Sequence, residues 1–393
     1  MTTVQLLSPT GSVASRVPDC APGIVLTEMQ QLAVNQILEG KNVIVHGEAG
    51  TGKSLVIGAV LRALHHADVC SNTLAHYLQY NYQEHDPSKI ISTHRLARTR
   101  LIILDEYVMV PTEDMHNLDE TLRYYLERDK VFGGVQLVLI GDPFQLPPVS
   151  QDRFAESQLF RDFDVAPIVL DMLMRQDASN DGNDDFINFL SRLRTGTMDV
   201  HASCFLNYVL HKPPRAPFLG ACATRKAVIA GNQIIVSKFD GPRYMLAKSV
   251  VTYEEGKLSS LLHIGAPVQL TKNVYSDDGE LLYYNGQFGT CKAIHGAQEM
   301  VHTDYGDYHL VQPKAAIVTV DIDGKEIETS DVECAYYTTI HRLQGQTIVS
   351  KLHVDLEGAP PDTVRQLAYV AFSRVKHFSQ VSTSLTSFDM ETW

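Results

Sequence analysis

Apolar runs and amphipathic segments alternate along residues 41–165. Three of these runs are almost continuously apolar: "NVIVHG" at 42–47, "LIILDE" at 101–106 and "VQLVLIGD" at 135–142. Strands of this kind are typical of a parallel sheet that helices cover on both faces. The segment "SLVIGAVLRALHH", which follows the first run, has the period of a helix. The pattern therefore predicts an α/β domain with crossover connections.

The second half of the chain repeats this pattern with an interruption. "DFINFLSRLRTG" at 185–196 predicts a helix, and "APFLGACATR" and "KLHVDL" predict strands of a second α/β unit. Between these two strands, residues 243–330 are rich in Val, Thr, Tyr and Gly and carry turn signals. Asp323-Gly324 is a favoured two-residue hairpin turn. We interpret this stretch as a small β-barrel inserted into the second α/β domain.

Composition and charge narrow the class of protein. Of the 393 residues, 44% are hydrophobic, which supports buried cores. The net charge of −13 argues against a protein that simply coats nucleic acid. Six cysteines are scattered without a Cys-x-x-Cys pair, so no zinc ribbon or redox pair is indicated. They favour an intracellular setting, with nucleus, cytoplasm and mitochondrion left open, and no apolar run predicts a membrane span.

The strongest motif follows the first apolar strand and precedes a helix. "GEAGTGKS" has the spacing of a phosphate-binding loop, and glycines there allow backbone N–H groups to surround phosphates. Its residues are Gly47, Glu48, Ala49, Gly50, Thr51, Gly52, Lys53 and Ser54. We expect Lys53 to reach the β- and γ-phosphates of ATP, and Ser54 to bind Mg²⁺.

Polar side chains end the next two strands. Asp105 is placed to bind the Mg²⁺, and Glu106 to orient or deprotonate the attacking water. Gln145 lies in "GDPFQLPPV", between residues that stiffen the loop. An amide there can donate to a phosphate oxygen and accept from water, so we expect it to respond to the γ-phosphate. The alternative without a function is that Asp105 and Glu106 form a solvated acidic turn. For Gln145, it is a turn glutamine that faces solvent.

Taken together, the motifs resemble a superfamily 1 helicase, of the petite-integration-frequency (Pif-like) branch first and the RecD-like branch next. The resemblance covers roughly residues 24 to 385, in the family's order. It is carried by "LTEMQ", the phosphate loop, "LDEYVMV", "GDPFQLPPV", "MRQ", "ATR" with Asn232, "GAPVQLTKN", "NGQFGT", "TIHRLQGQT" and "YVAFSR". Departures are the compact segment at 70–100 and Tyr107 where a small hydroxyl is common.

The resemblance implies two RecA-like P-loop domains with parallel sheets and an inserted β-barrel. We divide the chain into a flexible leader at 1–20, a first domain at 21–165, a second at 166–242 with 331–393, and the insertion at 243–330. The amino-terminal residues show no secretory signal.

Site roles also follow from the resemblance. Gln30 would read adenine. Arg175 and Arg374 would belong to the second domain and reach the γ-phosphate when the domains close, which stabilises developing charge. Gln344 and Gly345 would couple the nucleotide to the track. Taken singly, each arginine is equally well explained by a structural ion pair.

Candidate contacts to nucleic acid are basic or small polar residues. They are His94, Arg95, Arg98, Lys226, Lys272, Thr339 and His341, with Thr338 nearby. For any single one, a solvated surface position is the simpler interpretation.

The function expected from the resemblance is an ATP-dependent, monomeric motor that moves 5′ to 3′ on single-stranded DNA and unwinds tailed duplexes. We expect no membrane partner. Alternatives are an RNA helicase of a viral replication type and a nucleic-acid-stimulated ATPase without strong unwinding. A guanine-nucleotide switch would need Asn-Lys-x-Asp, which does not occur. An idle binding subunit would not need the intact set of Lys53, Asp105, Glu106, Gln145 and Arg374.

Overall fold

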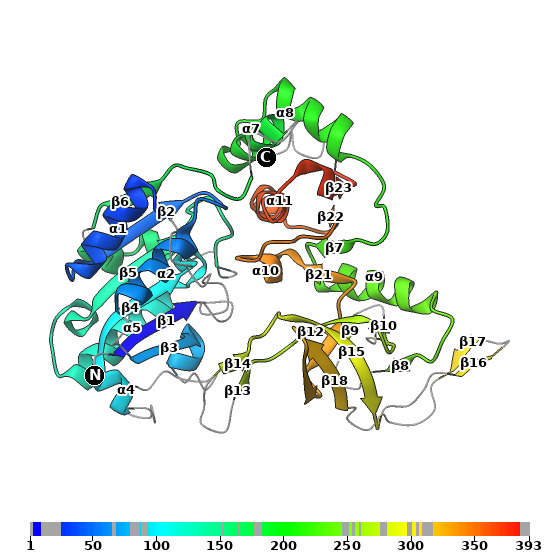
Figure 1. Ribbon diagram of the computed structural model, residues 1–393, viewed down its shortest axis with the longest axis horizontal. Coiled ribbons are helices and arrows are strands. Elements are labelled where there is room, and N and C mark those ends of the chain that lie inside the picture. Colours follow the sequence, from blue (N-terminus) through cyan, green and yellow to red (C-terminus); the bar gives the residue numbers. More distant parts are fainter. Residues whose placement is uncertain are drawn as a thin grey trace. The chain divides into compact units, whose positions relative to one another are not determined.

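In the computed structural model the chain folds as two units, Met1–Ile187 and Asn188–Trp393 (Figure 1). The structure describes residues 3–8, 25–64, 68–78, 87, 93–148, 150, 152–163, 165–176, 183–245, 251–253, 256–258, 261–275, 281–296, 301–303, 306–308 and 317–385. Within these ranges, every helix is too short or too polar to cross a membrane.

The first unit is built on a six-stranded sheet in the order β3-β1-β4-β5-β2-β6, and all its pairings are parallel. Its strands are β1 (Thr3–Ser8), β2 (Val43–Gly47), β3 (Asp68–Thr73), β4 (Thr99–Asp105), β5 (Gln136–Gly141) and β6 (Pro167–Leu170). The three predicted apolar strands are β2, β4 and β5, side by side with β5 in the middle. Because parallel strands end at the same edge, their carboxyl ends bring three loops together.

Helices cover both faces of this sheet, which explains the continuously apolar strands. They are α1 (Glu28–Leu38), α2 (Lys53–Ala63), α3 (Leu74–Tyr77), α4 (Thr93–Arg98), α5 (Thr112–Leu126) and α6 (Gln158–Phe163), with short 3₁₀ turns at Tyr107–Met109, Val131–Gly134 and Phe154–Glu156. On one face, Val43 and Val45 of β2 share a core with α1 and α2. On the other, Ile44 shares a core with α5 and α6.

The structure corrects both ends of the predicted first domain. Residues 3–8, assigned to a flexible leader at 1–20, form β1 between β3 and β4, with Val4, Leu6 and Leu7 buried. Residues 9–24 lie outside the described ranges. Residues 167–170, assigned to the second domain, form β6, which pairs with β2. The reason in both cases is tertiary pairing, which the local sequence pattern does not encode.

The second unit contains a four-stranded parallel sheet in the order β21-β7-β22-β23. These strands are β7 (Leu219–Cys222), β21 (Tyr337–Thr339), β22 (Leu352–Asp355) and β23 (Val381–Thr383). The helices are α7 (Asn183–Thr195), α8 (Val200–Cys204), which continues as a π-helix at Phe205–Leu210, α9 (Arg225–Ser237), α10 (Ile340–Leu343), α11 (Val364–Phe372) and a 3₁₀ turn at Phe378–Gln380. Two parallel-sheet units confirm the predicted α/β class.

Antiparallel strands are inserted between β7 and β21, as predicted. Five form one sheet, in the order β19-β18-β15-β12-β20: β12 (Pro267–Leu270), β15 (Phe288–His295), β18 (Ile317–Ile322), β19 (Lys325–Thr329) and β20 (Val332–Cys334). Two-stranded ladders join β8 (Tyr244–Met245) with β11 (Leu261–Leu262), β9 (Val251–Tyr253) with β10 (Gly256–Leu258), β13 (Val274–Tyr275) with β14 (Leu281–Tyr283), and β16 (Val301–Thr303) with β17 (Gly306–Tyr308). Among these described strands, no ladder closes β19 onto β20.

The predicted hairpin at Asp323-Gly324 is confirmed. It joins β18 to β19, and both turn residues have positive φ, +53° and +81°. Two left-handed residues match the right-handed twist of the strands they connect, which is why Asp-Gly is favoured there.

We expect the change Leu6→Ala to lower the free energy of unfolding by about 2–5 kcal/mol, because Leu6 is fully buried in the first unit's core. Val25→Ala, at a side chain that is 86% exposed, is the control and should change it by less than about 0.5 kcal/mol. Chemical denaturation measures both. Equal stability of the two variants would mean that β1 does not belong to the folded sheet.

Candidate functional site

The loop between β2 and α2 has the backbone of an anion-binding site. Gly50 and Gly52 take positive φ, +96° and +79°, which favours glycine. Gly52 precedes the first turn of α2 and brings no side chain to cap it. The N–H groups of that turn, with the helix dipole behind them, therefore suit a phosphate.

Lys53 interacts with backbone carbonyls of the loop and with carboxylates from neighbouring strand ends. Its Nζ donates to the carbonyl oxygens of Gly47, at 2.7 Å, and Glu48, at 2.8 Å. Burial lowers the pKa of Lys53, and the negative charges of Asp142, Glu106 and Asp105 oppose that effect. The carboxylates at the ends of β4 and β5 thus compensate the ammonium of the phosphate loop.

The two predicted carboxylates lie at the end of β4: Asp105 is its last residue and Glu106 follows it. Asp105 and Glu106 are both buried, with exposed fractions of 5% and 4%. Asp105 Oδ1 accepts the backbone N–H of Glu106 at 3.0 Å, which orients that carboxylate. Glu106 itself has φ +54°, a left-handed conformation that a non-glycine residue rarely adopts. Such backbone strain is concentrated at functional sites.

The end of β5 explains why Gln145 is held. Its backbone N–H donates to the carbonyl of Asp142 at 3.0 Å, and its Nε2 lies 3.5 Å from Asp142 Oδ2. Asp142 also accepts the N–H of Phe144 at 3.1 Å. Gln145 is therefore a buried, positioned amide rather than a solvent-facing turn residue.

Asp142 is a residue of the candidate site that the sequence did not lead us to expect. It is fully buried, and it is the carboxylate with the largest effect in raising the pKa of Lys53. The signal was available in the Gly-Asp-Pro that follows β5, which we interpreted only as a stiff turn.

Gln30 is tied to the phosphate loop. Its Oε1 accepts the N–H of Thr27 at 2.9 Å and its own N–H donates to the Thr27 hydroxyl, which together cap α1. Its Nε2 donates to the carbonyl of Thr51 at 3.0 Å and contacts Met174 Sδ at 3.3 Å. The predicted adenine reader thus lies directly beside the loop.

The structure corrects the placement of Arg175. The backbone N–H groups of Met174 and Arg175 donate to the carbonyl of Gly50 at 2.7 and 3.2 Å, so "MRQ" follows β6 and packs on the phosphate loop of its own unit. Its positive charge contributes to the lowered pKa of Lys53. Arg175 therefore lies in the first unit, not the second, because β6 carries it to the loop.

The site has ligands that suit Mg²⁺. A hydroxyl at Ser54 and a carboxylate at Asp105 are hard oxygen donors, which Mg²⁺ prefers. Within the described residues, no group of three or more His, Cys, Asp or Glu side chains could hold a metal alone. Mg²⁺ typically binds one or two protein oxygens together with substrate phosphates and water.

The remaining predicted nucleotide residues lie in the second unit. Gln344 is buried, and Gly345 has φ +75° directly after α10. Arg374 follows α11 and is 1% exposed. Its Nε donates to the carbonyl of Val370 at 2.8 Å and a terminal nitrogen donates to Ser373 Oγ at 2.7 Å.

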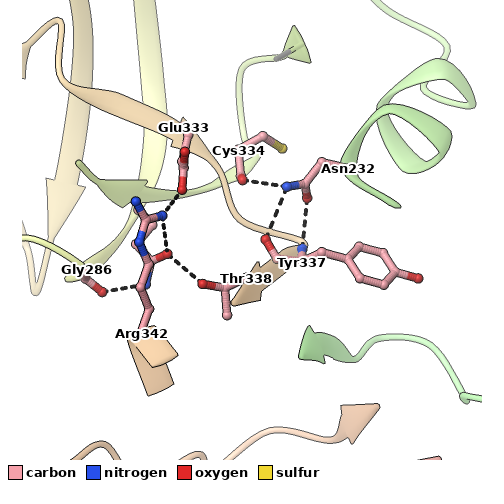
Figure 2. Close-up of polar contacts among 8 residues, drawn as sticks. Asn232, Gly286, Glu333, Cys334, Tyr337, Thr338 and Arg342 are labelled. Atoms are coloured by element: carbon pink, nitrogen blue, oxygen red, sulfur yellow. Dashed lines mark hydrogen bonds and ion pairs between the residues drawn. The ribbon is translucent and has the colours of Figure 1, made fainter. Parts of the chain in front are cut away.

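Asn232 of α9 holds the chain where the inserted strands return to the parallel sheet (Figure 2). Its Nδ2 donates to the carbonyls of Cys334 at 2.8 Å and Tyr337 at 3.1 Å. Its Oδ1 accepts the N–H of Tyr337 at 2.8 Å. The motif asparagine therefore fixes the passage from β20 to β21.

Gln269 of β12 makes a second connection, to the segment around α10. Its Oε1 accepts from Thr338 Oγ1 at 2.7 Å and from Arg342 at 3.3 Å, and its Nε2 donates to the carbonyl of Gly286 at 2.7 Å. Arg342 is also ion-paired with Glu333 of β20. The inserted sheet and the "TIHRLQGQT" motif are thus joined by buried polar contacts.

The predicted nucleic-acid contacts are distributed over several elements. His94 and Arg95 belong to α4, but their side chains lie outside what the structure describes. Arg98 and Lys226 are exposed.

Three further candidates lie in the second unit. Lys272 is 3.3 Å from Asp331 in an exposed ion pair. Thr339 is half-buried and begins α10, and burial lowers the pKa of its neighbour His341. None of these placements assigns a role.

Comparisons with known proteins agree with the motifs. The family model of the PIF1-like helicases matches residues 86–203. The ATP-dependent DNA helicase PIF1 of Saccharomyces cerevisiae is 26% identical over 329 residues, covering 72% of this chain and 37% of that protein. The Pif1 helicase of Bdellovibrio bacteriovorus is 24% identical over 405 aligned positions, covering 93% and 89%. This chain is thus similar to the Pif1-like helicases.

Solved Pif1 helicases have the same fold. Candida albicans Pif1 aligns with a TM-score of 0.71 at 22% identity, covering 94% of this chain and 96% of that one. Bacteroides Pif1 bound to single-stranded DNA aligns with a TM-score of 0.69 at 22% identity, covering 92% and 93%. The two parallel-sheet units thus have the fold of the RecA-like domains of these helicases.

Several curated Pif1-like relatives are much longer than the region matched here. The matched region spans 37% of the S. cerevisiae protein, 23% of PIF1 from Candida albicans and 28% of RRM3 from S. cerevisiae.

Alanine at Gly50 and at Gly40 should destabilise the protein to different degrees. Both residues have positive φ, so each change costs about 1–2 kcal/mol of backbone energy. A Cβ at Gly40 meets nothing within 4 Å, whereas one at Gly50 would lie 2.7 Å from Arg175 Cβ. We expect Gly50→Ala to cost a further 1–3 kcal/mol or so in the free energy of unfolding. Equal losses would contradict the packing of Arg175 on the loop.

Proposed function

We propose that this chain is an ATP-hydrolysing helicase that translocates on single-stranded DNA and unwinds duplexes. The observation that carries the proposal is the convergence of Asp105, Glu106 and Asp142 on the phosphate-loop Lys53. A phosphate-loop lysine close to a carboxylate that can bind Mg²⁺ and to one that can orient water is the set of groups that P-loop enzymes use for phosphoryl transfer. The similarity to proteins named ATP-dependent DNA helicases supports the choice of reaction.

In this proposal the described residues divide the chemistry of hydrolysis. Lys53 exchanges its bonds to Gly47 and Glu48 for bonds to the β- and γ-phosphates. Glu106 accepts a proton from the attacking water. Gln145, fixed by Asp142, donates its amide to the γ-phosphate. Ser54 and Asp105 would hold Mg²⁺, which supplies a positive charge to the phosphate oxygens.

The second RecA-like domain completes the motor in this proposal. Arg374 contributes its guanidinium to the transferring phosphoryl group, so hydrolysis requires the two domains to close on ATP. Gln344 and Gly345 connect this step to residues that contact the strand, such as Thr339 and His341. Bacteroides Pif1 was solved bound to single-stranded DNA, and in a second structure in complex with ADP-AlF₃ and single-stranded DNA. These complexes support the proposal of both ligands for this chain.

Replacing Lys53 by alanine should lower the rate of ATP hydrolysis by at least about a hundredfold, because the cation that meets the phosphates is lost. Binding of single-stranded DNA should persist, since that contact depends on other residues. Lys41→Ala is the matched control: Lys41 forms a surface ion pair with exposed Glu39, and its replacement should leave hydrolysis unchanged. Normal hydrolysis by Lys53→Ala would refute the site.

Duplexes with one single-stranded tail test the motor and its track. We expect ATP-dependent unwinding of DNA with a 5′ tail and little unwinding with a 3′ tail, because the proposed motor moves 5′ to 3′. DNA should also stimulate hydrolysis more than RNA of the same sequence. Preference for a 3′ tail would refute the polarity, and preference for RNA would favour the RNA helicase. Stimulated hydrolysis without unwinding would leave only a translocase.

A further inference from the structure

Tyr107 crosses a strand to reach the phosphate-loop strand. In the first sheet β4 and β2 are not neighbours, because β5 lies between them. In the β2–β5 register, Gly141 lies opposite His46. A Cβ at Gly141 would be 3.1 Å from Tyr107 Cδ1, so the absence of a side chain there makes room for the ring.

The ring of Tyr107 then meets His46. The Tyr107 hydroxyl and His46 Nε2 are 2.7 Å apart in a hydrogen bond. The two rings are nearly parallel, at 6°, with centroids 5.9 Å apart. One side chain from the turn after β4 is thus bonded to one from the end of β2.

Both partners are next to residues of the proposed ATP site. His46 directly precedes Gly47, whose carbonyl accepts from Lys53. Tyr107 directly follows Glu106, which is held at φ +54°. The hydrogen bond therefore links the strand that leads into the phosphate loop to the residue that follows Glu106, the proposed acceptor of a proton from the attacking water.

The surroundings make this link stiff. Tyr107 is 1% exposed, and Phe160 stacks near it with ring centroids 6.3 Å apart. Burial raises the pKa of Tyr107, so the hydroxyl keeps its proton and remains a hydrogen-bond donor at neutral pH. A strained residue such as Glu106 persists only where its neighbours determine its conformation, and Tyr107 is its covalent neighbour.

We propose that His46 and Tyr107 are positioning residues for ATP hydrolysis, whose hydrogen bond across Gly141 sets the place of the Glu106 carboxylate relative to the phosphate loop. The proposal rests on the proposed function, since it needs Glu106 to act on water. Neither residue touches the phosphates in this proposal. Loss of the bond therefore affects the rate of hydrolysis and leaves nucleotide affinity intact.

The test is a double-mutant cycle with Tyr107→Phe, His46→Phe and the double variant. Tyr107→Phe removes one oxygen and keeps the packed ring. We expect kcat for ATP hydrolysis to fall about tenfold to a hundredfold in each single variant, because small displacements of a catalytic group are costly. KM and the affinity for a non-hydrolysable ATP analogue should stay within about twofold of the values of the unchanged protein. The reason is that the bond acts on the hydrolysis step and does not contribute to nucleotide binding. The double variant should lose no more than the larger single loss, because the two changes remove one interaction.

A matched control separates positioning from packing. Tyr125 of α5 donates its hydroxyl to the carbonyl of Pro87 at 2.7 Å, and Tyr125→Phe also removes one tyrosine hydrogen bond from this unit. It should leave kcat unchanged. If one single variant does not fold, the double variant is compared with the other single variant. The double variant removes both polar partners of the bond, so neither is left buried without a hydrogen bond.

Other results would overturn the inference. An unchanged kcat in Tyr107→Phe, equal losses of kcat and affinity, additive losses in the double variant, or the same loss in Tyr125→Phe would each do so. Failure of the unchanged protein to hydrolyse ATP would instead refute the proposed function. The two failures are therefore distinguishable.

Discussion

The half-buried ammonium of Lys53 is the constraint on which the phosphate loop depends. A charge removed from water is stable only if opposite charges and hydrogen bonds replace the lost hydration. Here the carbonyls of Gly47 and Glu48 and the carboxylates of Asp105, Glu106 and Asp142 do so. Because the carboxylates end β4 and β5, the charge balance is met only when both strands end at the same edge as β2. Sheet order and site chemistry are therefore one requirement.

The second unit meets a different requirement, that of joining an antiparallel sheet to a parallel one. Backbone polar groups at such a passage lose their ladder partners and need others. Asn232 supplies three hydrogen bonds where β20 leads to β21, and Gln269 of β12 makes three more, with Thr338, Arg342 and Gly286. Buried networks that satisfy each member make a join specific and stiff. In the proposed motor, the inserted sheet would then move together with the "TIHRLQGQT" motif.

The sequence predicted those features that are local and periodic. The apolar strands β2, β4 and β5 and the Asp323-Gly324 hairpin were predictable because burial on both faces and a two-residue turn leave direct patterns. The phosphate loop was predictable for the same reason. By contrast, "TVQLLS" at residues 3–8 has no pattern of its own to separate it from a leader, and only pairing with β3 and β4 buries it.

Long-range pairing also explains the other differences. The short "PIVL" of β6 carries Arg175 to the first unit through its ladder with β2. The bond between Tyr107 and His46 depends on β5 lying between two strands and on a glycine at the crossing, neither of which spacing reveals. In the sequence, Tyr107 stood out only because the family that the motifs resemble commonly has a small hydroxyl residue at this position.

Gln30 and Lys53 together bear on how a nucleotide would bind. Each already donates to a carbonyl of the phosphate loop, Gln30 to Thr51 and Lys53 to Gly47 and Glu48. In the proposed ATP complex Gln30 would exchange one neutral acceptor for another, so it would contribute only the difference between two hydrogen bonds, on the order of 1 kcal/mol. Lys53 would exchange neutral carbonyls for charged phosphate oxygens, which are stronger partners for an ammonium. Affinity for the phosphates would then come from Lys53 together with the fixed N–H groups at the start of α2. Gln30 and Lys53 would serve to report, through the loop, that base and phosphates are both bound.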